Sequence, residues 1–167
     1  MATQIFKHMM PKDIPPFCTY LLSDEGQQYT SWQFDDLVGD PDDPGPMFPM
    51  SARRQALYVG ALKIDCVGWL FSTPTLIECK PDAGLSAIGQ IEGYAKWYSL
   101  MYNIYPRKMI VCESMRGQVQ TVAELLDIQV RIVQPANIET IERALVYVVP
   151  LIQPSPLFAN PLELPKL

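Results

Sequence analysis

The sequence predicts an α/β protein in which helices flank a mixed β-sheet. Residues 85–102 lack proline and repeat apolar side chains at three- and four-residue steps, which is typical of a helix that packs one face on a sheet. A strand, helix, strand order over 108–133 favours a crossover between parallel strands. Two strand candidates before the long helix are separated by a short turn, which is typical of an antiparallel hairpin.

Composition is that of one globular domain. The chain has 167 residues, of which 49% are hydrophobic and 19% charged, enough to bury a sizeable core without disulfides or a structural metal. No stretch approaches the roughly 20 apolar residues that cross a bilayer, and Met1 is followed by polar and basic residues without a signal-peptide core. We therefore expect a cytoplasmic protein with no membrane partner.

The first part of the chain, 1–50, is predicted to be an irregular, acidic and proline-rich segment packed on the core. A short helix is expected over 30–38, because a Thr/Ser capping pair precedes three apolar residues set among acids. The stretch 40–49 holds four prolines and is predicted to be a loop.

The α/β core is expected over 51–149, beginning with strands. Residues 57–70 are rich in β-branched, aromatic and apolar side chains with two glycine breaks, which indicates one or two strands. A turn at 72–74 follows, and then a short strand, 75–80, that Pro81 is expected to end. These two segments are predicted to pair as a hairpin.

After the long helix, further elements are expected in alternation. Strands are predicted over 108–112 and 128–133, with a helix over 118–126 between them. A helix over 137–149 begins with an asparagine cap. The last segment, 150–167, is rich in proline and is predicted to be an extended arm that packs on the domain or binds a protein partner or a second copy.

Cysteine and charge patterns narrow the function classes. The four cysteines form no C-x-x-C pair and there is one histidine, which argues against a structural zinc site and favours reduced, buried cysteines. The net charge of −5 arises within 24–43, which holds seven acidic residues and no Lys or Arg. The remaining eleven acidic and thirteen basic residues leave a nucleic-acid partner open, although no dense basic run is present for tight duplex binding.

Charged residues interrupt the hairpin strands. Alternation places Glu78 and Lys80 on one strand face, and pairing through the turn would bring Asp65 close to Glu78. Two carboxylates and a backbone carbonyl suit Mg²⁺ or Mn²⁺, and a lysine beside them could hold an attacking water or stabilise charge on a phosphate. A solvated surface ion pair is the alternative interpretation of the same three residues.

The order of these residues resembles the PD-(D/E)xK nuclease superfamily, in particular RecB-like members that carry a Q-x-x-x-Y helix. The run 76–81 (LIECKP) follows Ile64-Asp65 and precedes Gln90 and Tyr94, so all three motifs occur in the family's order over about 57–133. The resemblance implies a restriction-endonuclease-like core and the hydrolysis of phosphodiester bonds.

It also implies a metal site. Asp65, Glu78 and the backbone carbonyl of Cys79 would hold Mg²⁺ or Mn²⁺, and Lys80 would be the catalytic lysine. Family members often carry a further acid upstream, for which the candidates are Glu25, Asp35 and Asp36. An iron–sulfur cluster is not expected, because the cysteines do not follow the spacing of the relatives that hold one.

Further site residues are implied on the helix. Gln90 would orient the site, and Tyr94, one helical turn on, would support it or touch DNA. Basic side chains that could meet phosphate are scattered, with Arg53 and Arg54 favoured because they precede the site strands, and Lys96 as a further candidate.

The function expected from these observations is a Mg²⁺- or Mn²⁺-dependent DNA nuclease, a module of a larger phage or mobile-element assembly in the host cytoplasm or virion. One alternative is a non-catalytic structural or DNA-end-binding protein of a virion or packaging complex, which would keep the fold and use its proline-rich termini as docking arms. A junction-resolving enzyme on the same fold would require a dimer.

Overall fold

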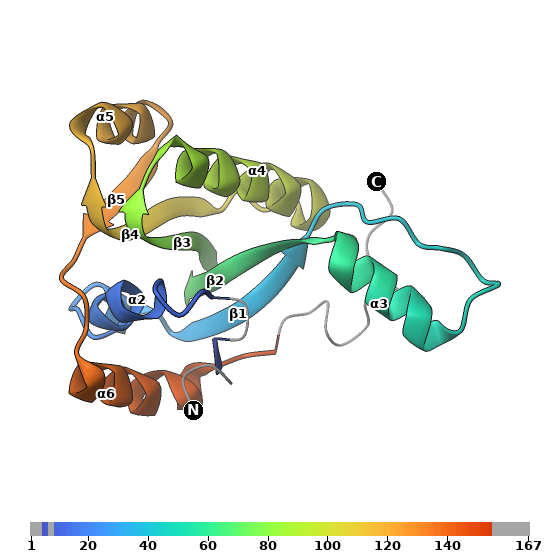
Figure 1. Cartoon of the computed structure of the whole chain (residues 1–167), viewed down its shortest axis with the longest axis horizontal. Helices are drawn as coiled ribbons and strands as arrows, with labels where there is room; N and C mark the ends of the chain where they lie inside the picture. The colour runs from blue at the N-terminus through green and yellow to red at the C-terminus, as the bar shows by residue number, and fades with distance from the viewer. Residues whose placement is uncertain (1–4, 7–8, 155–167) are drawn as a thin grey trace.

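Three layers make up the protein, with a sheet between two layers of helices (Figure 1). The computed structural model describes residues 5–6 and 9–154. Helices α4 (Leu85–Tyr102) and α5 (Gly117–Leu125) cover one face of the sheet, and α2 (Ile14–Leu21) and α6 (Ile138–Val148) cover the other. The predicted α/β class, a sheet flanked by helices, is confirmed.

The sheet has five strands in sequence order, and it is mixed. They are β1 (Ser31–Val38), β2 (Leu62–Leu70), β3 (Thr73–Ala83), β4 (Arg107–Met115) and β5 (Ile128–Ile132). Pairing is antiparallel from β1 to β3 and parallel from β3 to β5. The antiparallel pairing of β2 and β3 confirms the predicted hairpin. The parallel pairing of β4 and β5, which α5 connects, confirms the predicted crossover.

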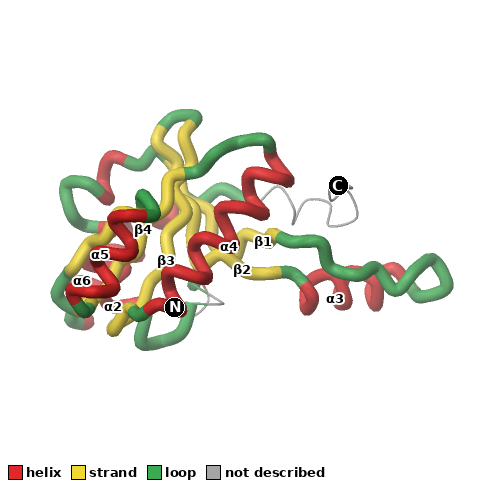
Figure 2. Tube along the Cα trace, turned by 90° about the horizontal axis from the view of Figure 1, so that it is seen from above, coloured by secondary structure: helices red, strands yellow, loops and turns green. Residues whose placement is uncertain are grey.

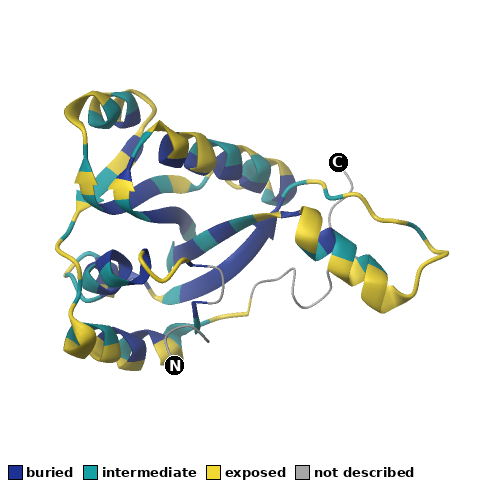
Figure 3. Ribbon diagram, in the orientation of Figure 1, coloured by how far each residue is buried: buried dark blue, intermediate teal, exposed yellow. Residues whose placement is uncertain are grey.

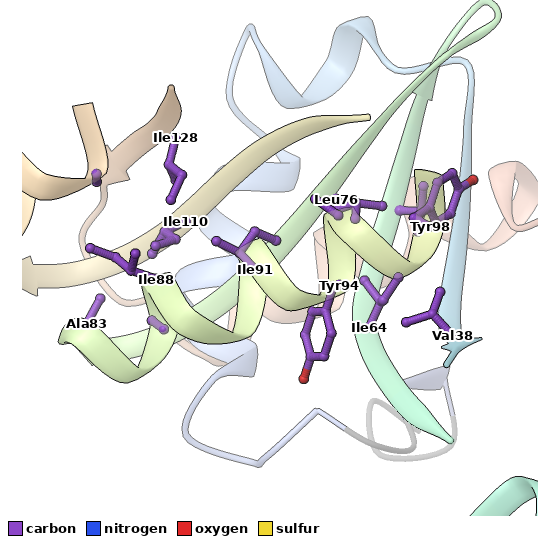
Figure 4. Packing of buried hydrophobic residues seen from close by; sticks show 14 of the residues in the cluster. Val38, Ile64, Leu76, Ala83, Ile88, Ile91, Tyr94, Tyr98, Ile110 and Ile128 are labelled. Atoms are coloured by element: carbon purple, nitrogen blue, oxygen red, sulfur yellow. The ribbon is translucent and has the colours of Figure 1, made fainter. Parts of the chain in front are cut away.

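Each face of the sheet has its own apolar core. Under α4, Ile88 and Ile91 pack against Leu76 of β3 and Ile110 of β4 (Figure 4). On the opposite face, the core includes Phe17 of α2, Leu145 of α6 and inward-facing strand residues. The four cysteines are free and buried, as predicted, and act as small apolar side chains. Strands at the centre are largely buried (Figure 3).

The segment 30–38 is a strand, so the predicted helix there is wrong. Trp32 and Phe34 are two residues apart and both pack edge-on against Phe17, with ring centroids 5.8 and 5.9 Å apart. A period of two is the period of a strand, and pairing with β2 fixes it. Tertiary packing therefore decides the structure where local helix propensity is weak.

Other boundaries near the N-terminus and hairpin also differ from the predictions. Segment 1–50 is not irregular throughout, because α2 lies within it with prolines in its first turn, where no helical N–H is needed. The stretch before β2 is the helix α3 (Met50–Gly60) rather than a strand. Pro81 lies within β3, which continues to Ala83 while still paired with β4.

A projecting arm connects β1 to β2. It consists of α3 and the loop 39–49, which contains the predicted loop 40–49 (Figure 2). Both views show α3 reaching away from the sheet, and Leu57 is its buried residue. Short 3-10 helices are η1 (Gly26–Gln28) and η2 (Val149–Leu151). The predicted arm 150–167 lies outside the described residues beyond Pro154.

None of the helices in the described part of the chain is both long enough and apolar enough to span a membrane.

A candidate active site at a fork in the sheet

Strands β2 and β3 separate to form a fork. They pair only between Cys66–Leu70 and Thr73–Ile77. On the N-terminal side of Cys66, β2 continues to pair with β1, and beyond Ile77, β3 continues to pair with β4. The two strands therefore diverge at Asp65 and Glu78, which flank the start of the opening.

The regular alternation of side chains is interrupted in β1 and β2 at the level of the fork. Ile64 packs in the core under α4 whereas Cys66 packs in the core under α2, although a regular strand places residues two apart on one face. Asp35, between the residues paired with Cys66 and Ile64, has φ +59°. A left-handed backbone is energetically costly for a non-glycine residue, so the surrounding structure must hold Asp35 in this conformation beside the fork.

Asp65 is fixed at the start of the fork by the opposite strand. Its Oδ2 accepts a hydrogen bond from the backbone N–H of Cys79, at 3.3 Å. The carboxylate of Asp65 thus lies next to the E-x-K segment of β3, across the line where the strands part.

Three charged side chains meet beside Asp65. Lys80 Nζ lies 2.8 Å from Glu78 Oε1 and 3.4 Å from Asp13 Oδ2. The side chains of Glu78 and Asp13 are each 1% exposed, whereas that of Lys80 is 25% exposed. Lys80 therefore links two buried carboxylates and still reaches solvent.

Asp13 was not anticipated from the sequence. It is the N-cap residue of α2, yet its side chain makes no capping hydrogen bond and instead faces Lys80. A signal was present, because an aspartate followed by Ile-Pro-Pro is typical of a helix start. In the sequence analysis the proline pair was interpreted as a break in regular structure, so the predicted site contained no residue from α2.

Gln90 and Tyr94 approach from α4. Their side chains are hydrogen-bonded to each other, and the Tyr94 hydroxyl lies within the electrostatic influence of Glu78 and Asp65. The tyrosine ring is largely buried, and its oxygen points away from the neighbouring apolar side chains in Figure 4. The helix thus brings an amide and a phenol to the acidic fork.

Burial strongly perturbs the acids. Burial is the largest cause, and together with the negative charge of Asp65 it raises the pKa of Glu78 to about 7 against the opposing effect of Lys80. Burial likewise raises the pKa of Asp65 to about 6, against Lys80 and the Cys79 N–H. Burial alone would lower the pKa of Lys80, but the hydrogen bond and charge of Glu78 outweigh it and raise that pKa. The buried carboxyl groups of the metal-free fork therefore resist ionisation and hold their protons to a higher pH than exposed acids do.

The other predicted acids lie in different settings. Glu25 forms a two-point ion pair with Arg131 of β5, at 2.5 and 2.9 Å. Asp36 lies on the α4 side, where its charge raises the pKa values of Tyr98 and Tyr102 after the larger effect of burial. Asp35 is buried close enough to Asp65 to raise its pKa. Among the three candidates, the structure places Asp35 next to the fork.

The predicted basic contacts lie outside the fork. Arg53 is on the projecting arm and binds Asp43, with Nε 2.9 Å from Oδ1. Arg54 follows it on α3, and Lys96 is exposed on α4. They do not share the cluster formed by Lys80 and its acidic partners.

The donor atoms of the fork fit a hard divalent cation. Among the described residues, no three His, Cys, Asp or Glu side chains are already arranged around a metal position. However, Asp13 Oδ1 and Glu78 Oε2 are buried and lack a hydrogen-bond partner. Buried oxygens of this kind are costly unless something pairs with them, and carboxylate oxygens are preferred ligands of Mg²⁺ and Mn²⁺.

Fold and site together define a three-layer α/β protein with a charged fork in a mixed sheet. The crystal structure of a repair endonuclease from Pyrococcus abyssi is similar to part of it, with 21% sequence identity and a TM-score of 0.41. The match covers 44% of this chain and 33% of that chain. No protein-family model matches the sequence, and no curated protein does.

Proposed function

We propose that this protein is a nuclease that hydrolyses phosphodiester bonds in DNA and depends on Mg²⁺ or Mn²⁺. The observation that carries the proposal is the meeting of Asp13, Asp65, Glu78 and Lys80 at the fork, with two buried carboxylate oxygens left unpartnered. A structural ion pair would satisfy its own buried oxygens, whereas a cation site leaves them available. The layered fold agrees with the restriction-endonuclease-like core that the motifs indicate.

Asp65, Glu78 and the carbonyl of Cys79 would hold the cation, with Asp13 as the upstream acid. Bound there, the ion would polarise a phosphoryl oxygen and lower the pKa of a water molecule. These residues come from β2, β3 and the start of α2. Correct folding of all three elements is therefore needed to assemble the ligand set.

Lys80 would donate hydrogen bonds rather than accept a proton. Its pKa is raised by Glu78, so it stays charged at neutral pH and is a poor general base. A charged ammonium that reaches solvent can orient the attacking water or stabilise negative charge on the phosphate. Gln90 and Tyr94 would position this end of the fork through their mutual hydrogen bond.

Cleavage assays on labelled single-stranded, duplex and branched DNA test the proposal, each with Mn²⁺, Mg²⁺ or EDTA. Glu78→Gln and Lys80→Met should each lower the rate by roughly 100-fold or more, which is the scale for losing one charge-stabilising group. Glu124→Gln is a matched control, because Glu124 is an exposed acid on α5 that contacts Gln120. Its activity should equal that of the wild type.

Metal binding gives an independent measurement. Calorimetry with Mn²⁺ should show binding by the wild type and weakened binding by Glu78→Gln. If no substrate is cleaved and no Mn²⁺ is bound, the nuclease proposal fails, and the non-catalytic structural or DNA-end-binding alternative takes its place. A role within a larger DNA-processing assembly would then be sought through protein partners.

A further inference from the structure

The base of the projecting arm lies beside the fork. Strand β2 leaves the arm at Leu62 and reaches Asp65 within its first half. The Tyr58 side chain, near the end of α3, lies within the electrostatic influence of Asp35, and Asp35 in turn acts on Asp65. In both views α3 runs from the outer part of the arm back toward the start of β2 (Figures 1 and 2). The arm therefore leads toward the fork.

Lys63 is held at the base of this arm. Its Nζ lies 4.8 Å from the centroid of the Tyr58 ring and 3.4 Å from the carbonyl oxygen of Ala61. The ring face attracts the cation, and the carbonyl accepts one of the three N–H donors of the ammonium. Because Lys63 is half-buried and its ammonium is already positioned, binding an anion costs this side chain little further freedom.

Arg54 extends the positive surface along α3. It lies four residues before Tyr58 and thus on the same helix face, about 6 Å away along the helix axis. Its neighbour Arg53 is bound to Asp43, whereas the ion pairs among the described residues do not include Arg54. Arg54 is exposed, so its guanidinium can meet a ligand from solvent.

The sequence around these two residues carries positive charge alone. From Pro44 to Ile64 the chain contains Arg53, Arg54 and Lys63 and no Asp or Glu. The acidic residues of the loop 39–49 all precede this stretch, at 40, 42 and 43, and the last of them is paired with Arg53. A polyanion that follows α3 to the start of β2 would therefore meet cations in succession.

We propose that Arg54 and Lys63 bind phosphates of the DNA strand on one side of the bond that the fork cleaves, an inference that rests on the proposed nuclease function. In the fork, Lys80 already faces two carboxylates, so the flanking phosphates need cations outside it. Lys63 is the basic residue of β2, the strand that also carries Asp65. Phosphate contacts of this kind position a strand without reading its sequence.

Binding measured without cleavage tests the arm separately from the fork. The anisotropy of fluorescein-labelled single-stranded and duplex oligonucleotides is recorded in EDTA over a series of KCl concentrations. Arg54→Gln and Lys63→Gln should each weaken binding by about two- to fivefold, the scale for one exposed ion pair. Each should also reduce the slope of log affinity against log salt by about 0.7–0.9, the value for one lost phosphate contact.

Two control variants separate charge from other effects. Arg143→Gln removes the same charge from the exposed surface of α6, which lies at the opposite end of the molecule from α3 in Figures 1 and 2, and should bind like the wild type. Lys63→Arg keeps the cation and should retain the salt slope. A slope lost equally in Lys63→Arg and Lys63→Gln would show that the change disturbs the arm rather than a phosphate contact.

Cleavage kinetics distinguish this proposal from the nuclease proposal. Arg54→Gln and Lys63→Gln should raise KM and leave kcat unchanged, because they remove contacts made equally in the ground and transition states. Cleavage with wild-type KM and wild-type DNA affinity in both variants would overturn the role of the arm and leave the nuclease standing. DNA binding that both variants weaken, without cleavage by the wild type in any metal, would support the role of the arm and refute the nuclease. A wild type that binds no DNA would overturn the role of the arm.

Discussion

Glu78→Gln should reduce the pH dependence of stability in the metal-free protein. The folded-state pKa of Glu78 is raised by burial and by Asp65, so the native state retains a proton that the unfolded chain releases at lower pH. Between the two pKa values, the native state binds more protons, and the free energy of unfolding falls as pH rises. The favourable contribution is complete below the unfolded pKa and is lost as pH rises through about 7.

The shift sets the size of this effect. Glu78 moves from 4.5 to about 7, and each pKa unit corresponds to about 1.4 kcal/mol, so full titration would remove on the order of 3 kcal/mol of stability. Asp65 is shifted in the same direction and titrates together with Glu78, so both contribute to one broad transition. Glutamine retains the shape of Glu78 but cannot ionise.

Urea unfolding in EDTA from pH 4.5 to 8 measures this dependence. The wild type should lose stability toward pH 8, and Glu78→Gln should lose much less. Glu124→Gln should follow the wild type, because Glu124 is exposed on α5. A wild-type protein whose stability rose between pH 5 and 8 relative to Glu78→Gln would refute the reasoning.

Three further substitutions probe the turn, the core and the fork. Phe71 is 81% exposed and has φ +55° in the β2–β3 turn, a conformation that glycine adopts at lower cost. Phe71→Gly should therefore raise the free energy of unfolding, measured by urea titration, by about 0.5–1 kcal/mol; a decrease would contradict this. Ile91→Ala truncates a fully buried side chain of α4 and should cost about 2–5 kcal/mol by the same measurement, and a loss under 1 kcal/mol would show that the cavity collapses. Asp13→Asn should weaken Mn²⁺ binding in calorimetry by about 10- to 100-fold, because it neutralises a buried carboxylate whose Oδ1 is unpartnered; unchanged binding would exclude Asp13 as a ligand.

Where local sequence and tertiary packing agree, the elements were predictable. Helix α4 has both an uninterrupted apolar stripe and no proline, and its predicted bounds match the structure. β1 was missed because Trp32 and Phe34 form a strand pattern only in relation to Phe17, which lies far earlier in the chain than a local pattern reaches. A single-sequence pattern does not show such a partner.

The site shows the same division between local and distant information. Spacing within β3 places Glu78 and Lys80 on one face, and the turn brings β2 alongside, so the prediction that Asp65 approaches them needs only local geometry. Asp13 is 67 positions from Lys80 and reaches it through the packing of α2 on the sheet. That approach depends on the order of layers, which the spacing of motifs does not contain.

The projecting arm occupies the place of a hairpin turn. Val38 and Leu62 are a paired position of the antiparallel strands β1 and β2, so all of 39–61 is an insertion where two residues would suffice. Loop closure becomes only slowly more costly with length, and α3 contributes only Leu57 as a buried residue. The sheet therefore bears this insertion at little energetic cost, which makes the β1–β2 connection a position where this architecture can gain, lose or exchange a whole element while its fork stays intact.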